Sequence, residues 1–356
     1  MYCTHDSLNI SHVTKLVLPE HNLCGTLPDS IGDFLYLGNL VLKNNTIFGT
    51  VPSTLNKLVN LEILTVNYNK LSQKLPDWLG NMTKLREFDF WANELTGAIP
   101  SYISMFHNLQ YLDVSDNKLT GIIPAVLGNL SKLKYLYVDH NALHGSIPSS
   151  LGNLNHLTYF YADTNKLTGT LPPELSNMKS LAYLFLFQNK LVGSLDKVFN
   201  ASTQTNLSIV RISSNQFTGT LPDQLFLLPS LTVIDAVTNC ITHDQLSEVV
   251  CKGTKLKTIA LDGLHTASQC RKDLLPGVTS TYRMTPALRG TLPSCIFELP
   301  SLVSLHLSSN GISGTLPQDV KFGRNFTDLE LSHNFFTDSI PERFQSHPWT
   351  KLDLSY

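Results

Sequence analysis

The sequence predicts an α/β solenoid of about 14 turns of 24 residues, stacked along one parallel sheet. Three features recur in the regular turns: an asparagine, a Leu-x-Leu alternation before it, and a Leu-x-Gly-x-Leu/Ile-Pro block after it. Counted from His21, which takes the place of the asparagine in the first turn, seven consecutive intervals measure 24 residues. A fixed period of this kind indicates stacked supersecondary units rather than separate globular domains. The asparagines in register are Asn45, Asn69, Asn93, Asn117, Asn141, Asn165, Asn189, Asn215, Asn239, Asn310 and Asn334.

Each turn is expected to contain a short strand ahead of its asparagine. Before Asn117, for example, Leu109, Leu112 and Val114 fill a Leu-x-x-Leu-x-Leu pattern, with Val in the third place. Alternation with a period of two puts one face of a strand in the core and the other in solvent. Stacked turns bring neighbouring strands to about 4.8 Å from one another, which is the spacing of a sheet.

The residues that follow each strand predict a tight bend. A buried asparagine side chain can donate and accept hydrogen bonds at once, so it can satisfy backbone groups of the adjoining loop. A glycine such as Gly121 permits a sharp bend, and the proline that often follows, here Pro124, ends regular structure. These segments lack the 3.6-residue period that a stack of helices would require.

The unit Asn-x-Leu-x-Gly-x-Ile-Pro-x-x-Leu-Gly-Asn-Leu-x-x-Leu stands intact at residues 117–133 and 141–157. With this unit the chain resembles plant-type extracellular leucine-rich repeat proteins, in particular the ectodomains of leucine-rich repeat receptor-like kinases and receptor-like proteins. The resemblance covers nearly the whole chain. It implies a right-handed superhelix with the parallel sheet on its concave face and short helical turns on the opposite side.

The register divides the chain into four parts. Residues 1–12 resemble the remnant of an N-terminal cap, and residues 13–239 are regular repeats. Residues 240–289 are irregular, and residues 290–356 return to the repeat but stop inside an expected strand. Two interpretations of the irregular segment stay open: two decayed repeats, or an insertion resembling the island that contacts ligand in some receptor ectodomains. Both ends are expected to continue in a longer protein.

Cysteines and glycosylation sequons favour an extracellular chain. Four of the six cysteines gather where the repeat fails, which suggests disulfides in an oxidising compartment. Free buried thiols are the alternative, and the sequence does not choose the pairing. The candidate disulfide residues are Cys3, Cys24, Cys240, Cys251, Cys270 and Cys295. Candidate glycosylation sites, each opening an Asn-x-Ser/Thr sequon, are Asn9, Asn44, Asn81, Asn129, Asn200, Asn206 and Asn325.

Charge and motifs exclude several classes of function. A net charge of −2 supplies no basic footprint for nucleic acid. The sequence holds no nucleophile elbow, phosphate-binding loop, dinucleotide fingerprint or His-Glu-x-x-His. His140 and His144 are four residues apart, but they fall in an expected turn rather than on one helix face. We expect no enzyme activity, no catalytic residue, no cofactor and no metal site in this chain, although a kinase domain could follow it.

A partner surface is predicted on the concave face, because the alternate strand positions are committed to the core. Six, four and two residues before the asparagines, aromatic and acidic residues form columns that neighbouring strands bring together. Exposed aromatic patches generally mark interaction sites, and the alternative is that the rings simply stack on one another. The predicted partner-binding residues are Trp91, Tyr111, Asp113, Tyr135, Tyr137, Asp139, Tyr159, Tyr161, Asp163, Tyr183, Phe185 and Phe187.

The resemblance and this surface together predict a recognition module at the cell surface or outside the cell. Its expected partner is a protein or peptide ligand, with a glycan or a co-receptor ectodomain as further candidates and with a membrane anchor in the full-length protein. Two other functions stay open. One is a secreted inhibitor of wall-degrading hydrolases, similar to polygalacturonase-inhibiting proteins. The other is a structural or adhesive surface protein, for which featureless columns are expected.

Overall fold

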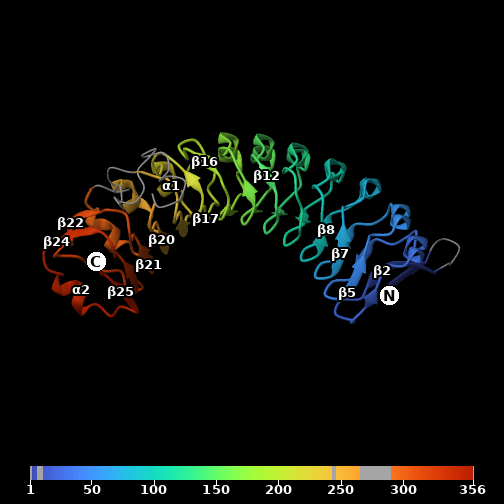
Figure 1. The fold of residues 1–356 in the computed structure, drawn as a ribbon, viewed down its shortest axis with the longest axis horizontal. Coiled ribbons are helices and arrows are strands. Elements are labelled where there is room, and N and C mark those ends of the chain that lie inside the picture. Colours follow the sequence, from blue (N-terminus) through green and yellow to red (C-terminus); the bar gives the residue numbers. More distant parts are fainter. Residues whose placement is uncertain (1, 6–10, 243–245, 265–289, 356) are drawn as a thin grey trace, which may run out of the picture. The chain divides into compact units, whose positions relative to one another are not determined.

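The computed structural model describes the backbone of residues 2–5 and residues 11–242, 246–264 and 290–355. It divides into two compact units, residues 1–167 and residues 168–356, which are described one at a time. In each unit, turns of the chain stack so that their strands form a parallel sheet, and short helical turns lie on the opposite side (Figure 1). The predicted α/β solenoid with a parallel sheet is confirmed.

In unit 1 the sheet starts with an antiparallel pair and continues with parallel strands, one from each turn. Partners along the parallel part are 24 residues apart, as in Tyr111 opposite Tyr135. In order, its strands are β1 (Tyr2–His5), β2 (Ser11–Val17), β4 (Asn39–Val41), β6 (Ile63–Thr65), β8 (Glu87–Asp89), β10 (Tyr111–Asp113), β11 (Tyr135–Tyr137) and β13 (Tyr159–Tyr161).

A second row of short strands and a row of 3-10 helices complete the turns of unit 1. The short strands are β3 (Cys24–Gly25), β5 (Thr46–Gly49), β7 (Lys70–Gln73), β9 (Glu94–Leu95), β12 (His144–Gly145) and β14 (Lys166–Leu167). The helices are η1 (Asp29–Asp33), η2 (Ser53–Lys57), η3 (Asp77–Asn81), η4 (Ser101–Met105), η5 (Ala125–Asn129) and η6 (Ser149–Asn153). A proline stands directly before each helix, as Pro124 does before η5 with φ −67°. The proline thus starts a helical turn as well as ending the strand, because its fixed φ suits both.

Unit 2 repeats this plan. The strands of its parallel sheet are β15 (Tyr183–Phe185), β17 (Ile209–Arg211), β19 (Val233–Asp235), β20 (Thr258–Ala260), β21 (Ser304–His306), β23 (Asp328–Glu330) and β25 (Lys351–Asp353). Its short strands are β16 (Val192–Gly193), β18 (Gln216–Phe217), β22 (Ser313–Thr315) and β24 (Phe335–Thr337). Its helices are η7 (Pro173–Asn177), α1 (Asp223–Phe226), η8 (Glu248–Lys252), η9 (Ser294–Glu298) and α2 (Glu342–Ser346). None of the described helices is both long and apolar enough to cross a bilayer.

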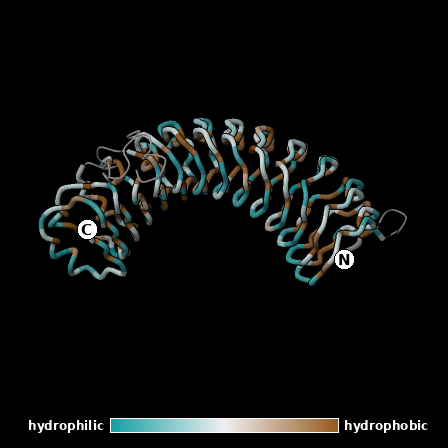
Figure 2. Tube along the Cα trace, viewed as in Figure 1, coloured by the Kyte–Doolittle hydropathy of each residue, from teal (hydrophilic) through white to brown (hydrophobic). Residues whose placement is uncertain are grey.

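The core of each unit consists of apolar side chains that recur once or more in every turn, as the brown positions of Figure 2 show. Leu112 and Leu136, the central residues of β10 and β11, have no exposed surface. The asparagine at the end of each strand is hydrogen-bonded as predicted. The Asn117 amide donates to the carbonyls of Phe90, Val114 and Ser115 at 2.9–3.2 Å, and its Oδ1 accepts from Leu95 N. Each asparagine therefore joins its own turn to the preceding one.

The residue directly before each asparagine has a positive φ, a feature that the repeat alignment did not reveal. In Ala92 and His140, φ is 52° and 48°. This left-handed region is disfavoured for residues with a Cβ, so each of these positions stores a small strain. The other residues in this place are Asn44, Tyr68, Asp116, Thr164, Gln188, Ser214, Thr238, Ser309 and His333.

The irregular segment of unit 2 leaves the sheet unbroken. Strand β20 pairs directly with β21, so that Thr258 lies opposite Ser304, 46 residues further on. Leu264 N donates to Asn310 Oδ1 across the same interval at 2.9 Å. Because β20 and β21 pair directly, no further strand lies between them in the sheet. Residues 265–289, half of the irregular segment, lie outside the described residues, and both interpretations of 240–289 and its boundaries stay predictions.

One disulfide joins η8 to η9, between Cys251 and Cys295, with the Cα atoms 5.7 Å apart. Cys240 is disulfide-bonded as well. The disulfide prediction is wrong for Cys24, which is a free thiol. It faces solvent from β3 and meets no second cysteine in the described part of the chain. The side chain of Cys3, and Cys270, lie outside the described residues.

Candidate functional site

The candidate site lies on the open face of the sheet in unit 1, meaning the face that points away from the core. Because strand side chains alternate, Tyr111, Asp113 and Ser115 point to the open face, whereas Leu112 and Val114 are fully buried. Strands β10, β11 and β13 are in register, so their tyrosines and acids come together. The sequence columns are therefore real rows of side chains.

Five tyrosines cover this part of the open face, and all are half-buried. Tyr135 and Tyr159 are stacked, with ring centroids 4.9 Å apart and planes at 18°. Tyr137 and Tyr161 make an edge contact at 4.9 Å, and Tyr111 lies 5.5 Å from Tyr135. The rings thus contact one another and keep an accessible side. We call Tyr111, Tyr135, Tyr137, Tyr159 and Tyr161 the tyrosine row.

The acids beside the tyrosine row are far less exposed than predicted. Asp113 and Asp163 retain 6% and 2% of their accessible surface, so the expectation of exposed acids is wrong for both. The reason for Asp113 is local: Tyr111 Oη donates to one carboxylate oxygen at 3.1 Å, and Ser115 N and Oγ donate to the other at 2.9 and 2.6 Å. Asp89, on the preceding strand, is equally buried at 4%.

Burial shifts the titration of these carboxylates. The low polarity around Asp89, together with the nearby Asp113 carboxylate, raises its pKa to about 7. Burial likewise raises the pKa of Asp113, although the hydrogen bonds from Ser115 oppose the shift. The pKa of Asp139 rises to about 6, chiefly through burial, while the hydrogen bond to His140 holds it down. The net charge of the site therefore changes near neutral pH, where Asp89 and Asp139 gain or lose a proton.

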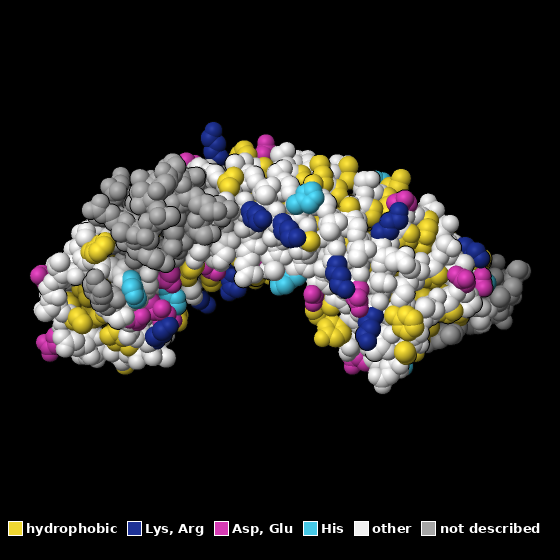
Figure 3. Space-filling view, in the orientation of Figure 1, with side chains coloured by type: hydrophobic (Ala, Val, Ile, Leu, Met, Phe, Trp, Pro, Cys, Tyr) yellow, Lys and Arg dark blue, Asp and Glu magenta, His cyan; other side chains and the backbone are white. Residues whose placement is uncertain are grey.

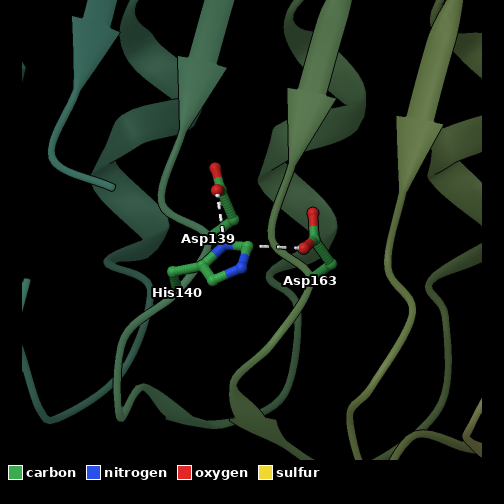
Figure 4. A group of neighbouring side chains, drawn as sticks. All are labelled: Asp139, His140 and Asp163. Atoms are coloured by element: carbon green, nitrogen blue, oxygen red, sulfur yellow. Dashed lines mark hydrogen bonds and ion pairs between the residues drawn. The ribbon is translucent and has the colours of Figure 1, made fainter. Parts of the chain in front are cut away.

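His140 lies at the rim of this acidic group. Figure 4 shows its ring lying near the Asp139 and Asp163 carboxylates, beyond the ends of two neighbouring strands. Its Nδ1 is 3.0 Å from Asp139 Oδ2 and 3.8 Å from Asp163 Oδ2. The imidazole side chain is 52% exposed, whereas Asp163 is almost fully covered. A polar group of a ligand could therefore reach the imidazole directly, whereas the Asp163 carboxylate is covered.

A shallow pocket of about 300 Å³ borders the tyrosine row on one side. Tyr111 and Tyr135 form one wall, and Arg86, Glu87 and Gln110 supply polar groups. The remaining lining residue is Ile63. The pocket is small enough for one side chain of a bound partner.

The other predicted binding residues lie apart from the tyrosine row or in the other unit. Trp91 is 39% exposed, and its ring centroid lies 5.5 Å from that of Tyr68, which the sequence analysis had not singled out. In unit 2, Phe185 and Phe187 have ring centroids 6.3 Å apart, and the Arg211 guanidinium lies 5.1 Å from the Phe185 centroid. Tyr183 is half-buried on the same strand as Phe185.

Two groups of side chains in the described residues have donors close enough for one metal ion. One is Asp139, His140 and Asp163; the other is His306, Asp328 and Glu330 in unit 2. The second group was not singled out from the sequence, although its residues lie on β21 and β23, whose partners are the usual 24 residues apart. Aligning the residues four places before Asn310 and Asn334 would have paired His306 with Glu330.

Comparisons with known proteins bear on both fold and function. Two family models, each described as a leucine-rich repeat, match residues 83–143 and residues 60–82, 156–178 and 301–322. A comparison with curated proteins gives no match. The chain is a leucine-rich repeat solenoid, and its structure is similar to those of plant receptor kinase ectodomains.

Three solved structures illustrate the similarity. The PEPR1–AtPEP1 crystal structure is 28% identical with a TM-score of 0.74, over 94% of this chain and 50% of that one. The ectodomain of the plant membrane receptor kinase GASSHO1/SCHENGEN3 from Arabidopsis thaliana, in complex with CASPARIAN STRIP INTEGRITY FACTOR 2, is 30% identical with a TM-score of 0.57, over 94% and 46%. A leucine-rich repeat protein of Leptospira interrogans is 26% identical with a TM-score of 0.70, over 96% and 78%. The chain thus spans about half the length of the two receptor structures.

Proposed function

We propose that the chain is part of the ectodomain of a cell-surface receptor and binds a peptide or protein ligand on the tyrosine row of unit 1. The observation that carries this proposal is the tyrosine row itself: five half-exposed rings on three adjacent strands, bordered by carboxylates. Aromatic residues dominate binding hot spots, because they bury a large area at low entropic cost. The similarity to the PEPR1–AtPEP1 structure and to the GASSHO1/SCHENGEN3 complex supports a ligand-binding role.

The chemistry of the row favours a ligand with a basic side chain. The faces of Tyr137 and Tyr161 attract a cation, and Asp139 provides a half-buried carboxylate beside them. The molecule already contains a contact of this kind, since Arg211 lies 5.1 Å from the Phe185 ring in unit 2. Arginine fits better than lysine, because its planar guanidinium stacks on rings and forms paired hydrogen bonds with a carboxylate.

Disulfides and exposed sequons support an extracellular location. The Cys251–Cys295 bond requires an oxidising compartment. Of the candidate glycosylation residues, Asn200 is half-buried and Asn9 lies outside the described residues. The exposed ones are Asn44, Asn81, Asn129, Asn206 and Asn325. Glycan attachment, a co-receptor and a membrane anchor stay predictions.

Fluorescence anisotropy with labelled glycine-rich peptides tests the proposal. Each peptide carries one central arginine, and its partner peptide carries the uncharged isostere citrulline. We expect the arginine peptide to bind at least about tenfold tighter, and the Tyr137→Ala/Tyr161→Ala double variant to lose at least about tenfold in affinity. Tyr36→Ala is the matched control, because Tyr36 is an exposed tyrosine of unit 1 outside the tyrosine row.

Thermal melting separates recognition from ring stacking. If the tyrosines only stabilise the sheet, the double variant will lower the melting temperature of the chain while leaving peptide affinity unchanged. Equal affinity for the arginine and citrulline peptides would contradict the basic ligand. Asp139→Asn should reduce the preference for arginine without weakening citrulline binding, because it removes charge and keeps the shape of the side chain.

A further inference from the structure

The open face of unit 2 carries a polar cluster where unit 1 has tyrosines. His306 on β21 lies opposite Glu330 on β23, and Ser304 lies opposite Asp328 on the same two strands. Figure 3 shows histidine, acidic and basic side chains close together near the C-terminal end of this unit. The side chains of His306, Asp328 and Glu330 are 18–28% exposed, so the cluster is sheltered but can be reached from solvent.

The His306 imidazole is the centre of the cluster. Its Nε2 lies 2.9 Å from Asp328 Oδ2 and 3.4 Å from Glu330 Oε1. Its Nδ1 lies 3.9 Å from Asp262 Oδ2, which belongs to the neighbouring turn. Ser304 Oγ is within 3.0 Å of both His306 Nε2 and Asp328 Oδ2. Three carboxylates therefore surround one imidazole.

The charges in this cluster are not balanced by the side chains that contact it. Among the described residues, Lys351 is the cation paired with it, and it pairs with Glu330 alone. Asp328 Oδ1 is buried and has no hydrogen-bond partner in the described part of the chain. A half-buried surplus of negative charge is costly unless a cation compensates for it.

The geometry suits a metal ion. Zinc binds histidine nitrogen and carboxylate oxygen at about 2.0–2.1 Å in a tetrahedral arrangement, so its ligand atoms lie about 3.3 Å from one another. The two distances from His306 Nε2, 2.9 and 3.4 Å, bracket this value. All three donor atoms lie within 4.8 Å of one another. Asp262 would orient the imidazole through Nδ1, as the outer carboxylate does in many carboxylate–histidine–zinc sites.

We propose that His306, Asp328 and Glu330 form a binding site for a divalent transition-metal ion, with Zn²⁺ as the preferred ion and Asp262 as a positioning residue. A mixed nitrogen and carboxylate donor set suits zinc better than calcium or magnesium, which favour oxygen ligands alone. The metal takes the place of the proton between His306 and Asp328. The proposal is independent of the peptide-binding function of unit 1.

Isothermal titration of the EDTA-treated chain with ZnCl₂ tests the site. We expect one equivalent to bind with a dissociation constant at or below about 10 μM. His306→Gln and Glu330→Gln should weaken binding at least about 100-fold and tenfold, while circular dichroism shows that both variants remain folded. Asp262→Asn should cost about tenfold, because it removes only the orienting carboxylate. The matched control is His333→Gln, an exposed histidine of the adjacent turn.

Cobalt provides a second readout. Bound Co²⁺ should show the strong visible absorption of a tetrahedral complex, and that absorption should disappear in His306→Gln but persist in His140→Gln. Absence of saturable Zn²⁺ binding up to about 1 mM would overturn the proposal and leave a hydrogen-bonded network without a metal. Zinc binding that His306→Gln leaves unchanged, or that His140→Gln removes, would overturn it too.

Discussion

The two units place a histidine among carboxylates on the same face of the sheet, but at different places in the repeat. His140 stands just after a strand, beside Tyr137 and Asp139, and half of its imidazole is exposed. His306 lies within a strand, and its side chain is 23% exposed between Asp328 and its neighbours. A position within a strand holds the His306 ring in a fixed orientation, as a metal ligand requires. A position in a turn leaves the His140 ring accessible to a binding partner. The repeat position therefore sets the role of the residue.

The largest expected effect tests whether the asparagines stabilise the turns equally in both units. Asn117→Ala in unit 1 and Asn310→Ala in unit 2 should each lower the free energy of unfolding by about 3 kcal/mol, because several backbone groups, partly buried in unit 1 and buried in unit 2, lose their partners. Chemical denaturation of both variants measures the loss. A much smaller cost for Asn310→Ala would mean that the sheet next to the irregular segment 240–289 is held differently.

The next prediction concerns the buried acids of unit 1. Since the folded-state pKa of Asp89 is about 7, above the 3.8 of an ordinary aspartate, folding is favoured by protonation, and this contribution is lost as pH rises from about 4 to 7. Asp89→Asn keeps this side chain uncharged at both pH values. The substitution should therefore raise the free energy of unfolding by about 2 kcal/mol more at pH 8 than at pH 4. Melting curves of wild type and variant at both pH values provide the comparison. A difference that does not change with pH would contradict the raised pKa.

Ligand binding in unit 1 should depend on pH in the opposite sense. A basic ligand needs the Asp139 carboxylate ionised, and the pKa of that group is about 6. Affinity for the arginine peptide should therefore fall about tenfold, about 1.4 kcal/mol, between pH 7.5 and pH 5. Anisotropy titrations across this range measure the effect. The citrulline peptide is the control, and an equal fall in its affinity would point to unfolding instead.

The smallest expected effect concerns the left-handed residues that both units contain. Ala92→Gly in unit 1 and Ser309→Gly in unit 2 should each stabilise the chain by about 0.5 kcal/mol, since φ is 52° and 60° there. Glycine removes the steric strain but gains freedom in the unfolded chain, so the net gain is small. Ala142→Gly, just after Asn141 and without a positive φ, should destabilise the chain instead. Denaturation midpoints of the three variants, compared with that of the wild type, measure these changes in stability.

The fold was predictable because its signal is repeated. Each turn restates the same Leu-x-Leu alternation and the same asparagine, and Asn117 makes the hydrogen bonds that its chemistry predicts. The role of the proline that precedes every described helix except η8 was predicted only in part. Proline alone accounts for the end of the strand, because its φ is fixed and it lacks an N–H group. The start of a helix depends in addition on the five residues that follow the proline.

The residues of the candidate site could be predicted from the sequence, but the exposed fraction of their side chains could not. The column of Tyr111 and Asp113 follows from counting, yet the burial of Asp113 depends on how the Tyr111 hydroxyl and the Ser115 side chain fold over it. Counting pairs His306 on β21 with Glu330 on β23 at the usual interval of 24 residues, but it does not show that their side chains approach to 3.4 Å. Counting at a period of 24 does not bring Asp262 to His306, because the partners on β20 and β21 are 46 residues apart.

The asparagine at each turn also has a consequence for how the molecule comes apart. Asn117 bonds to Phe90 and Leu95 of the preceding turn as well as to its own, so each asparagine connects adjacent turns. Turns coupled in this way unfold together with their neighbours rather than one at a time. Under hydrogen exchange or a pulling force, opening should spread from an end along the stack, and amides of central turns such as that of Asn117 should exchange last.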